Sequence, residues 1–373
     1  MATVDILSPS VTLKTIGPPP VVGPTTKRPT RPTQQIPQSV IVNARNIVRQ
    51  EFDPARHLNY VPPKKIISMA DIGLEGAGIS DTAVSEPFSL FTDEAIAQIR
   101  AEMFSEKVLE KCQFASSFAS NMIRGYDERQ ALFSSRGGPG IRLTWRHSLA
   151  PFTFKAWYSP EVAKAVSEIA GIDLVPVMPY EIGHCNISVN NRKPDQAELE
   201  RMRNHPGESM EAFAWHRDSY PFVCVTMLSD CSDMVGGETV LRTGDGRTMK
   251  VRGPSMGSAV VLQGRYIEHQ ALKAFTGGER ISMITPWRPR SPLVKDEIVL
   301  TTVRPISYQD DLYPQFAEYR LQTLIARLEW QLAQIRRHGQ NGQKFDLEGV
   351  REFLGHQGGY INDTLAEMFK YED

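Results

Sequence analysis

Hydrophobic and polar positions alternate with a period of two along the middle of the chain, over about residues 172–290. Such alternation predicts β-strands that bury one face. The expected strands span 222–228, 238–242, 248–252, 258–262, 268–274 and 280–286. Asp245-Gly246 is a two-residue hairpin signal between the second and third of them. Many short strands with regular turns predict a mainly β protein with a jelly-roll core.

Apolar residues follow helical spacing on the N-terminal side of this region. The first helix is expected over 92–111, with the Thr92 side chain capping its N-terminus. A second helix is expected from Ser159 to Ala170, because Ser159 is a capping residue, a proline follows it, and Gly171 ends the pattern. Helices are therefore expected to flank the strands.

The chain becomes helical again after Pro292. Leucine and isoleucine at helical spacing predict a long amphipathic helix over about 313–338, and a shorter helical piece closes the C-terminal region of about 313–370. We expect the long helix to brace the outside of the strands. A dimer contact through the C-terminal helices is the alternative.

The N-terminal part of the chain differs in composition. Residues 1–50 are rich in proline and threonine, which predicts a loosely ordered arm that buries little. Residues 51–90 are expected to be an irregular lead-in to a single domain spanning 51–373. The charged stretch 190–211 interrupts the strands and is expected to form an excursion near the mouth of the barrel, as a lid would.

Composition excludes several classes of protein. The 373 residues are 41% hydrophobic with a net charge of −1, and no basic run points to nucleic acid. No apolar stretch reaches transmembrane length, and the N-terminus lacks the pattern of a secretory signal. The four cysteines have no metal-binding spacing, so they are expected to be reduced thiols. We therefore expect a cytoplasmic protein with no membrane or nucleic-acid partner.

Two histidines and one aspartate are the candidate metal ligands and catalytic residues. His216 and Asp218 lie two positions apart, so a strand would direct both side chains to one face, and His269 follows a later apolar run. Two imidazoles and a carboxylate form the ligand set of non-heme iron oxygenases. The alternatives are a charged turn at a strand end for His216 and Asp218 and a core histidine for His269.

Arg280 and Ser282 are the candidate anion site. Both fall on the same face of the last expected strand, and a guanidinium fork beside a hydroxyl suits a carboxylate. The alternative for Arg280 is a surface ion pair with Glu279 or Glu268.

Two further groups are candidates for ligand contacts. His184 and Asn186 share one face of an expected strand that also includes Tyr180 and Ile182, and a hydrogen-bonded core row is the alternative. Upstream, the stretch 137–149 gathers Arg142, Arg146, a tryptophan and a histidine. A substrate-facing strand is one interpretation of this stretch, and a surface turn with charged edges is the other.

The order HRD, then EHQ, then RIS resembles the Fe(II)/2-oxoglutarate-dependent dioxygenases. The resemblance is firm over about residues 172–290, and the stretch VRGPSMGSAVVLQGRYIEHQAL is similar to fungal members of this superfamily associated with secondary metabolism. It implies a double-stranded β-helix, that is, a jelly-roll or cupin-like core, with flanking α-helices. It also implies that His216, Asp218 and His269 bind iron.

The resemblance further implies a cosubstrate site and an activity. Arg280 and Ser282 would bind the far carboxylate of 2-oxoglutarate. From their strand face alone, Asn186 is a candidate contact to this cosubstrate or to substrate, and His184 is a candidate contact to substrate or a group that only supports the site from behind. The expected enzyme uses molecular oxygen to oxidise a small molecule, an amino acid or a secondary metabolite. Hydroxylation, desaturation and oxidative cyclisation all stay open.

Two other functions fit the same residues. An iron oxidase of the isopenicillin N synthase type uses no 2-oxoglutarate and binds a substrate carboxylate with its Arg-x-Ser. A non-catalytic cupin-like binding protein would keep the residues without turnover.

Overall fold

The computed structural model describes residues 30–32, 36–115, 121–126, 149–189, 195, 197, 200, 215–230, 236–251, 255–272 and 279–370. Arg142 and Arg146 lie outside these residues, as does most of the charged excursion. The predictions made for them therefore stay predictions.

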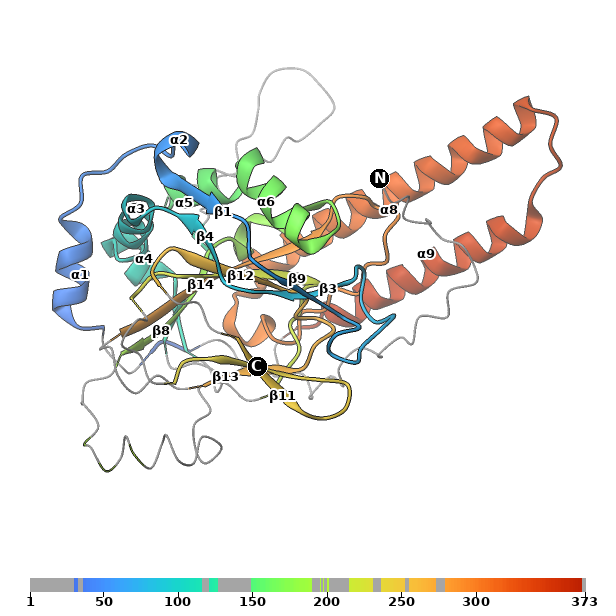
Figure 1. Ribbon diagram of the computed structural model, residues 1–373. Coiled ribbons are helices and arrows are strands. Elements are labelled where there is room, and N and C mark those ends of the chain that lie inside the picture. The colour runs from blue at the N-terminus through green and yellow to red at the C-terminus, as the bar shows by residue number, and fades with distance from the viewer. Residues whose placement is uncertain are drawn as a thin grey trace, which may run out of the picture.

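Two antiparallel sheets carry the fold (Figure 1). The large sheet has 11 strands in the path β1-β4-β12-β9-β14-β8-β6-β5, with β2, β3 and β7 paired at its side, and the small sheet has the order β11-β10-β13. The large sheet consists of β1 (Leu58–Val61), β2 (Ile66–Ser68), β3 (Thr82–Ser85), β4 (Phe88–Phe91), β5 (Gln113–Phe114), β6 (Met122–Ile123), β7 (Leu174–Pro176), β8 (His184–Val189), β9 (Phe222–Met227), β12 (Ser258–Leu262) and β14 (Glu279–Pro289). The small sheet consists of β10 (Thr239–Arg242), β11 (Thr248–Val251) and β13 (His269–Ala271).

All six strands expected between 222 and 286 are present, with ends shifted by a few residues. The hairpin between β10 and β11 turns at Asp245-Gly246, where Gly246 adopts a φ of 82° that favours glycine. Sequence alternation was thus a sufficient signal for these strands.

Opposite faces of the large sheet have different neighbours. On β9, Phe222 and Cys224 belong to the main hydrophobic core, whereas Val223 and Val225 line an internal cavity. This division follows from the period of two along a strand. Helices α3 (Asp93–Met103), α4 (Glu106–Lys111), α5 (Pro151–Trp157) and α6 (Pro160–Ala170) contribute to the main core (Figure 1).

The helical predictions before the strands are confirmed with one correction. Thr92 caps α3 by accepting a hydrogen bond from Ala95 N, and Ser159 caps α6 in the same way. The single helix expected over 92–111 is instead two helices, α3 and α4, separated at Phe104 and Ser105. The expectation was wrong because Ser105 begins the new helix and the chain turns there to bury Phe104.

Residues 51–90, expected to be irregular, form α2 (Pro54–His57) and strands β1 to β4. These strands are only three or four residues long. β3 and β4 pair with β12, far along the chain. Strands of three or four residues show little periodicity in sequence, and β3 and β4 form by pairing with the distant strand β12. The prediction that residues 51–90 are irregular was wrong for this reason.

The division of the chain at residue 50 stays a prediction, but the last part of the expected arm packs on the body. Helix α1 (Gln38–Arg45) buries Ile41 and Ala44 in the main core. Arg45 Nε donates a hydrogen bond to the Phe104 carbonyl at 2.8 Å. Residues 36–50 therefore stabilise the folded body.

The C-terminal region is a long helical hairpin that projects from the sheets (Figure 1). It consists of α8 (Gln309–Gln340) and α9 (Leu347–Glu367), and two short 3-10 turns, η1 (Pro179–Glu181) and η2 (Arg304–Ile306), lie earlier in the chain. The first turns of α8 brace the body, because Leu312 and Phe316 are buried. Among the described residues, no helix is long and apolar enough to cross a membrane.

Candidate metal centre

His216 and His269 are brought together by backbone pairing. His216 N donates to His269 O at 2.9 Å, and His269 N donates to His216 O at 2.8 Å. This single antiparallel bridge extends the small sheet beyond β13. Asp218, two residues on, donates its backbone N–H to Gly264 O at 3.0 Å. Within the described residues 215–220 only His216 is in a β-bridge, so a strand, as expected from the alternation, does not carry both ligands.

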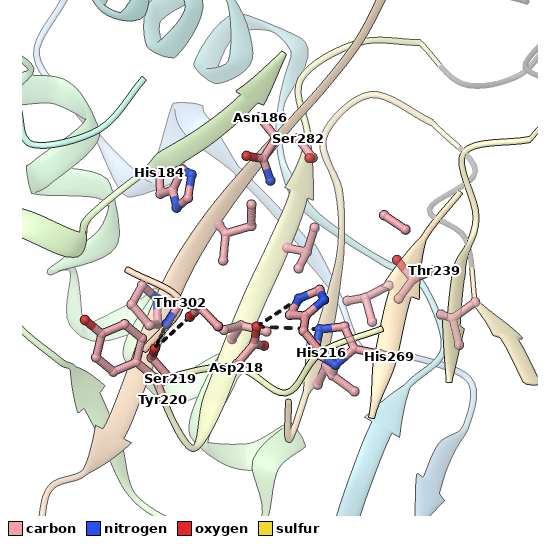
Figure 2. A pocket seen from close by; sticks show the side chains of 18 of the residues that line it. His184, Asn186, His216, Asp218, Ser219, Tyr220, Thr239, His269, Ser282 and Thr302 are labelled. Atoms are coloured by element: carbon pink, nitrogen blue, oxygen red, sulfur yellow. Dashed lines mark hydrogen bonds and ion pairs between the residues drawn. The ribbon is translucent and has the colours of Figure 1, made fainter. Parts of the chain in front are cut away.

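The three side chains converge on one point (Figure 2). Asp218 Oδ1 lies 3.7 Å from His216 Nε2 and 3.5 Å from His269 Nε2. One potential ligand atom from each residue lies within 4.8 Å of the other two. Across the described residues this is the cluster of His, Cys, Asp and Glu side chains with metal-binding geometry. The three residues proposed from the sequence as metal ligands therefore lie together in the folded protein.

The orientation of His269 favours metal binding through Nε2. Its Nδ1 lies 2.9 Å from the Ile267 carbonyl, which can only accept a hydrogen bond. A proton on Nδ1 satisfies this carbonyl, so Nε2, which faces Asp218, is the ring nitrogen that would bind a metal once it has lost its own proton.

The electrostatics of the cluster favour an ionised carboxylate. Burial by itself would raise the pKa of Asp218, but the imidazole of His269, assisted by that of His216, holds this pKa below its usual range. Burial lowers the pKa of His269, and the Asp218 carboxylate outweighs that effect and raises it. The carboxylate thus attracts positive charge to the centre, where a proton and a metal cation would compete.

The cluster lies on the wall of a cavity of about 190 Å³ between the two sheets. Both sheets contribute side chains, and most of them are aliphatic. The apolar members of the lining are Val84, Met122, Val223, Val225, Met227, Leu241, Val251, Val260, Leu262, Ala271, Ile284, Pro286, Val303 and Ile306. The cavity therefore surrounds the cluster with surface that disfavours water.

Arg280 and Ser282 face this cavity from β14, as the sequence predicted. Both are buried, and Arg280 Nη1 donates to Ser282 Oγ at 3.3 Å while its Nε donates to Gly237 O at 3.2 Å. The two nearby acids have other arginine partners. Glu279 lies 2.8 Å from Arg100, and Glu268 lies 3.1 Å from Arg242. A surface ion pair with either acid is therefore not the role of Arg280.

His184 and Asn186 reach the cavity from β8, next to β14 (Figure 2). Asn186 pairs with Ser282 in the register of the two strands, and His184 pairs with Ile284. Burial lowers the pKa of His184 to about 3, so its imidazole is neutral. His184 Nε2 and Asn186 Oδ1 are buried without a hydrogen-bond partner of good geometry among the described residues, and the Asn186 side chain is close enough to His184 to act against the lowering of its pKa.

The strand expected to include Tyr180 and Ile182 as well as His184 and Asn186 begins instead at His184. Tyr180 lies in the 3-10 turn η1, and Ile182 follows it outside the strand. Tyr180 N donates to Gln315 Oε1 of α8 at 2.8 Å. The expectation for Tyr180 and Ile182 was wrong because this contact with α8, far along the chain, holds the first of these residues in a turn.

Sequence reasoning missed the wall contributed by the segment after β14. Thr302, Val303 and Ile306 line the cavity. Thr302 Oγ1 lies 2.6 Å from Ser219 Oγ, and Thr302 N donates to the same oxygen at 3.1 Å (Figure 2). Ser219 follows directly after Asp218, so its position was a usable signal. Nothing in the local sequence marks Thr302.

A buried ion pair at the cavity was also missed. Glu181 lines the cavity and accepts a hydrogen bond from Arg124, and both side chains are almost fully buried. Burial raises the pKa of Glu181, and Arg124 only partly opposes this. Neither residue lies in a recognisable motif. Because the two are 57 positions apart in the chain, the sequence gives no sign that they pair.

No protein-family model and no curated protein matches the chain. Over part of its length it is similar to several solved oxygenase structures. A prolyl-4-hydroxylase from Pseudomonas putida is 15% identical, covering 62% of this chain and 98% of that one, with a TM-score of 0.31. AviO1 from Streptomyces viridochromogenes Tue57 is 15% identical, covering 55% and 88%, with a TM-score of 0.32.

A third similar structure is an oxidoreductase of the 2OG-Fe(II) oxygenase family from Burkholderia pseudomallei. It is 13% identical, with a TM-score of 0.29. The match covers 45% of this chain and 65% of the Burkholderia protein, just under two thirds of its length. TM-scores this low carry no conclusion about the fold or the reaction of this chain.

Proposed function

We propose that this protein is an Fe(II)/2-oxoglutarate-dependent oxygenase that oxidises a small molecule. The observation that carries the proposal is a single cavity that presents two His and one Asp at one place and a buried Arg-Ser pair at another. The two-sheet arrangement around the cavity supports a double-stranded β-helix as the fold, since ligand sites lie between the sheets in such proteins.

The donor set fits Fe(II). Imidazole nitrogens and a carboxylate oxygen suit this ion, and three protein ligands leave coordination positions for other molecules. His216, Asp218 and His269 would hold the metal. The ionised state of Asp218 and the Nδ1 proton of His269 are the forms that binding requires.

The Arg280–Ser282 pair fits the distal carboxylate of 2-oxoglutarate. A guanidinium offers a fork of N–H donors that matches a carboxylate, and the adjacent hydroxyl adds another donor. Asn186 pairs with Ser282 in the strand register and supplies a further polar contact on the same wall. A dicarboxylate with one end at the metal would place its other carboxylate against Arg280 and Ser282, beside Asn186.

Bound Fe(II) and 2-oxoglutarate would supply oxygen activation and hydrogen abstraction, with loss of CO₂ and formation of succinate. The chain contributes binding and exclusion of water. The aliphatic lining keeps the centre dry, while neutral His184 holds a hydrogen-bonding nitrogen toward the ligand space without adding charge. A small substrate, oxidised by hydroxylation, desaturation or cyclisation, is consistent with this cavity.

The test is stoichiometry in the full-length protein. Purified protein loaded with Fe(II) is supplied with oxygen and 2-oxoglutarate, and a panel of amino acids and small carboxylic acids is screened for faster succinate release. We expect one succinate per product. Asp218→Ala is expected to abolish the release of succinate and the formation of product. Asp363→Ala, which changes an exposed carboxylate on α9, is the matched control.

Two outcomes would overturn the proposal. Product formation with iron and oxygen but without 2-oxoglutarate would assign an oxidase, with Arg280 binding the substrate's own carboxylate. Metal binding without oxygen consumption under any condition of the screen would assign a non-catalytic binding protein.

A further inference from the structure

Large apolar side chains are exposed along the α8–α9 hairpin. Eight of them are between 42% and 61% exposed: Leu321, Ile325, Leu328, Leu332, Leu347, Leu354, Ile361 and Leu365. The hairpin projects from the body, so no sheet covers this surface (Figure 1).

The exposed residues of α8 follow the spacing of a coiled-coil seam. Leu321, Ile325, Leu328 and Leu332 are separated by four, three and four residues. The side of α8 that faces α9 is different, because the buried residues Arg320 and Arg327 contact Tyr360 there. The seam is therefore a second apolar surface beside the one that holds the hairpin together.

The exposed residues of α9 follow a matching pattern. Leu354 and Ile361 come one residue after Phe353 and Tyr360, which are buried toward α8. On α8, Leu321 and Leu328 likewise come one residue after Arg320 and Arg327. One residue rotates a side chain by about 100° around a helix.

Because the two helices are antiparallel, the same rotation brings both rows to the same side of the hairpin. We call this surface, made of the eight residues above, the hairpin face. The exposed surface of the two helices outside these rows is polar or small, with Gln322, Glu329 and Ala333 on α8 and Glu352 and Asp363 on α9. The hairpin as a whole is thus amphipathic beyond the contact between its two helices.

The size of the hairpin face suits a protein interface. Eight half-exposed side chains of this kind present roughly 700 Å² of apolar surface, close to the ~800 Å² that each partner buries in a stable complex. A monomer seldom leaves so large a continuous patch in water.

Charge indicates which partner covers it. Glu318 precedes the seam, Arg336 follows it, and both lie on the same flank of α8. If two copies of α8 pack antiparallel with their centres between Ile325 and Leu328, Glu318 of each copy lies beside Arg336 of the other. Residues 309–367 hold nine acidic and six basic residues, a balance that disfavours an anionic membrane surface.

We propose that the hairpin face binds the same face of a second copy of this chain. The arrangement is a two-fold symmetric bundle of four helices in which α8 packs antiparallel on α8 of the partner. This assembly is independent of the reaction proposed above, since the hairpin face contains no residue of the cavity.

The first experiment measures mass in solution for the full-length protein, by light scattering and sedimentation across the micromolar range. We expect the wild type to be a dimer. Leu328→Glu, alone or with Ile325→Glu, is expected to give a monomer with unchanged helicity by circular dichroism, because these side chains are not core. Ala333→Glu adds the same charge outside the hairpin face and is expected to stay a dimer.

The second experiment exchanges the charges of Glu318 and Arg336, which are proposed to pair only between two copies of the chain. Glu318→Arg and Arg336→Glu are each expected to weaken the dimer at least tenfold by placing like charges together, and the double variant is expected to restore it. A wild type that is monomeric at every concentration would overturn the proposal, including the case in which residues 1–29 cover the face. A dimer unaffected by Leu328→Glu would also overturn it.

Discussion

The carboxylate of Asp218 occupies the space that a side chain at Gly264 would need. A Cβ atom at Gly264 would collide with Asp218 Oδ2. Gly264 O also accepts the backbone N–H of Asp218. Gly264 therefore both anchors Asp218, a proposed metal ligand, and leaves room for its side chain.

Gly264→Ala is expected to displace the Asp218 carboxylate and weaken Fe(II) binding by about 10- to 100-fold, the range seen when a group that orients a ligand is lost. Metal titration of the folded apoprotein measures this. Gly339→Ala is the control, because a Cβ there meets nothing within 4 Å. Equal metal affinity in the Gly264→Ala variant would show that Asp218 is not held by this loop.

Arg280→Gln is expected to weaken 2-oxoglutarate binding and leave Fe(II) binding unchanged. Loss of one partner of a buried charge pair costs about 2–5 kcal/mol, which is roughly 30- to several-thousand-fold in Kd. Calorimetric titration of 2-oxoglutarate into the metal-loaded protein provides the measurement. Arg242→Gln, which removes an arginine half exposed on the small sheet, serves as the control. If both variants bind 2-oxoglutarate equally well, Arg280 does not bind this cosubstrate.

Glu367, at the end of α9, is expected to hold the cavity wall in place. Its Oε2 accepts from Leu300 N at 2.7 Å and from Arg304 Nη2 at 2.5 Å, on either side of Thr302. Glu367→Ala leaves a buried cation without this carboxylate and is expected to lower the free energy of unfolding by about 3–5 kcal/mol. Urea denaturation measures the loss, and Glu367→Gln should lose less because it keeps a hydrogen-bond acceptor. A change below 1 kcal/mol in the alanine variant would contradict this role.

Truncation should distinguish the two parts of the N-terminal region. Deletion of residues 1–29 is expected to leave stability and metal binding intact, because their composition is rich in proline and threonine. Deletion of residues 1–50 also removes α1, so it is expected to expose core around Phe104 and lower the melting temperature. Thermal unfolding and metal titration of both forms provide the test. Equal stability of the two truncated forms would show that α1 contributes nothing.

The buried thiols should be inert and should limit stability at high pH. Burial raises the pKa of Cys185 and of Cys224 to about 12. In the unfolded chain these thiols ionise near 9, so the unfolded state gains stability relative to the folded state as pH rises from 9 toward 12. Alkylation at pH 8 is expected at neither thiol until denaturant is added. Rapid modification of either one in the folded protein would contradict its burial.

The sequence could indicate which side chains to consider as a candidate site because the relevant signals are local, while the roles of these residues stay predictions. His-x-Asp, the later His269 and the Arg-x-Ser each occupy a few adjacent positions, and the structure brings all five side chains to one cavity. Arg142 and Arg146 lie outside the described residues and stay predictions. The Ser219–Thr302 contact was not predictable, because it joins segments separated by most of the β-rich region.

The sequence by itself determined which segments form strands and helices where the pattern is long, as in β9, β14, α6 and α8, because side-chain periodicity is a property of consecutive residues. It also supplied the candidate metal ligands, whose role stays a prediction. Only the tertiary structure decided that the short strands β1 to β4 form, that His216 pairs with His269, and that Thr302 lines the cavity. Each of these depends on hydrogen bonds to a partner distant in sequence, and a local pattern does not specify such a partner.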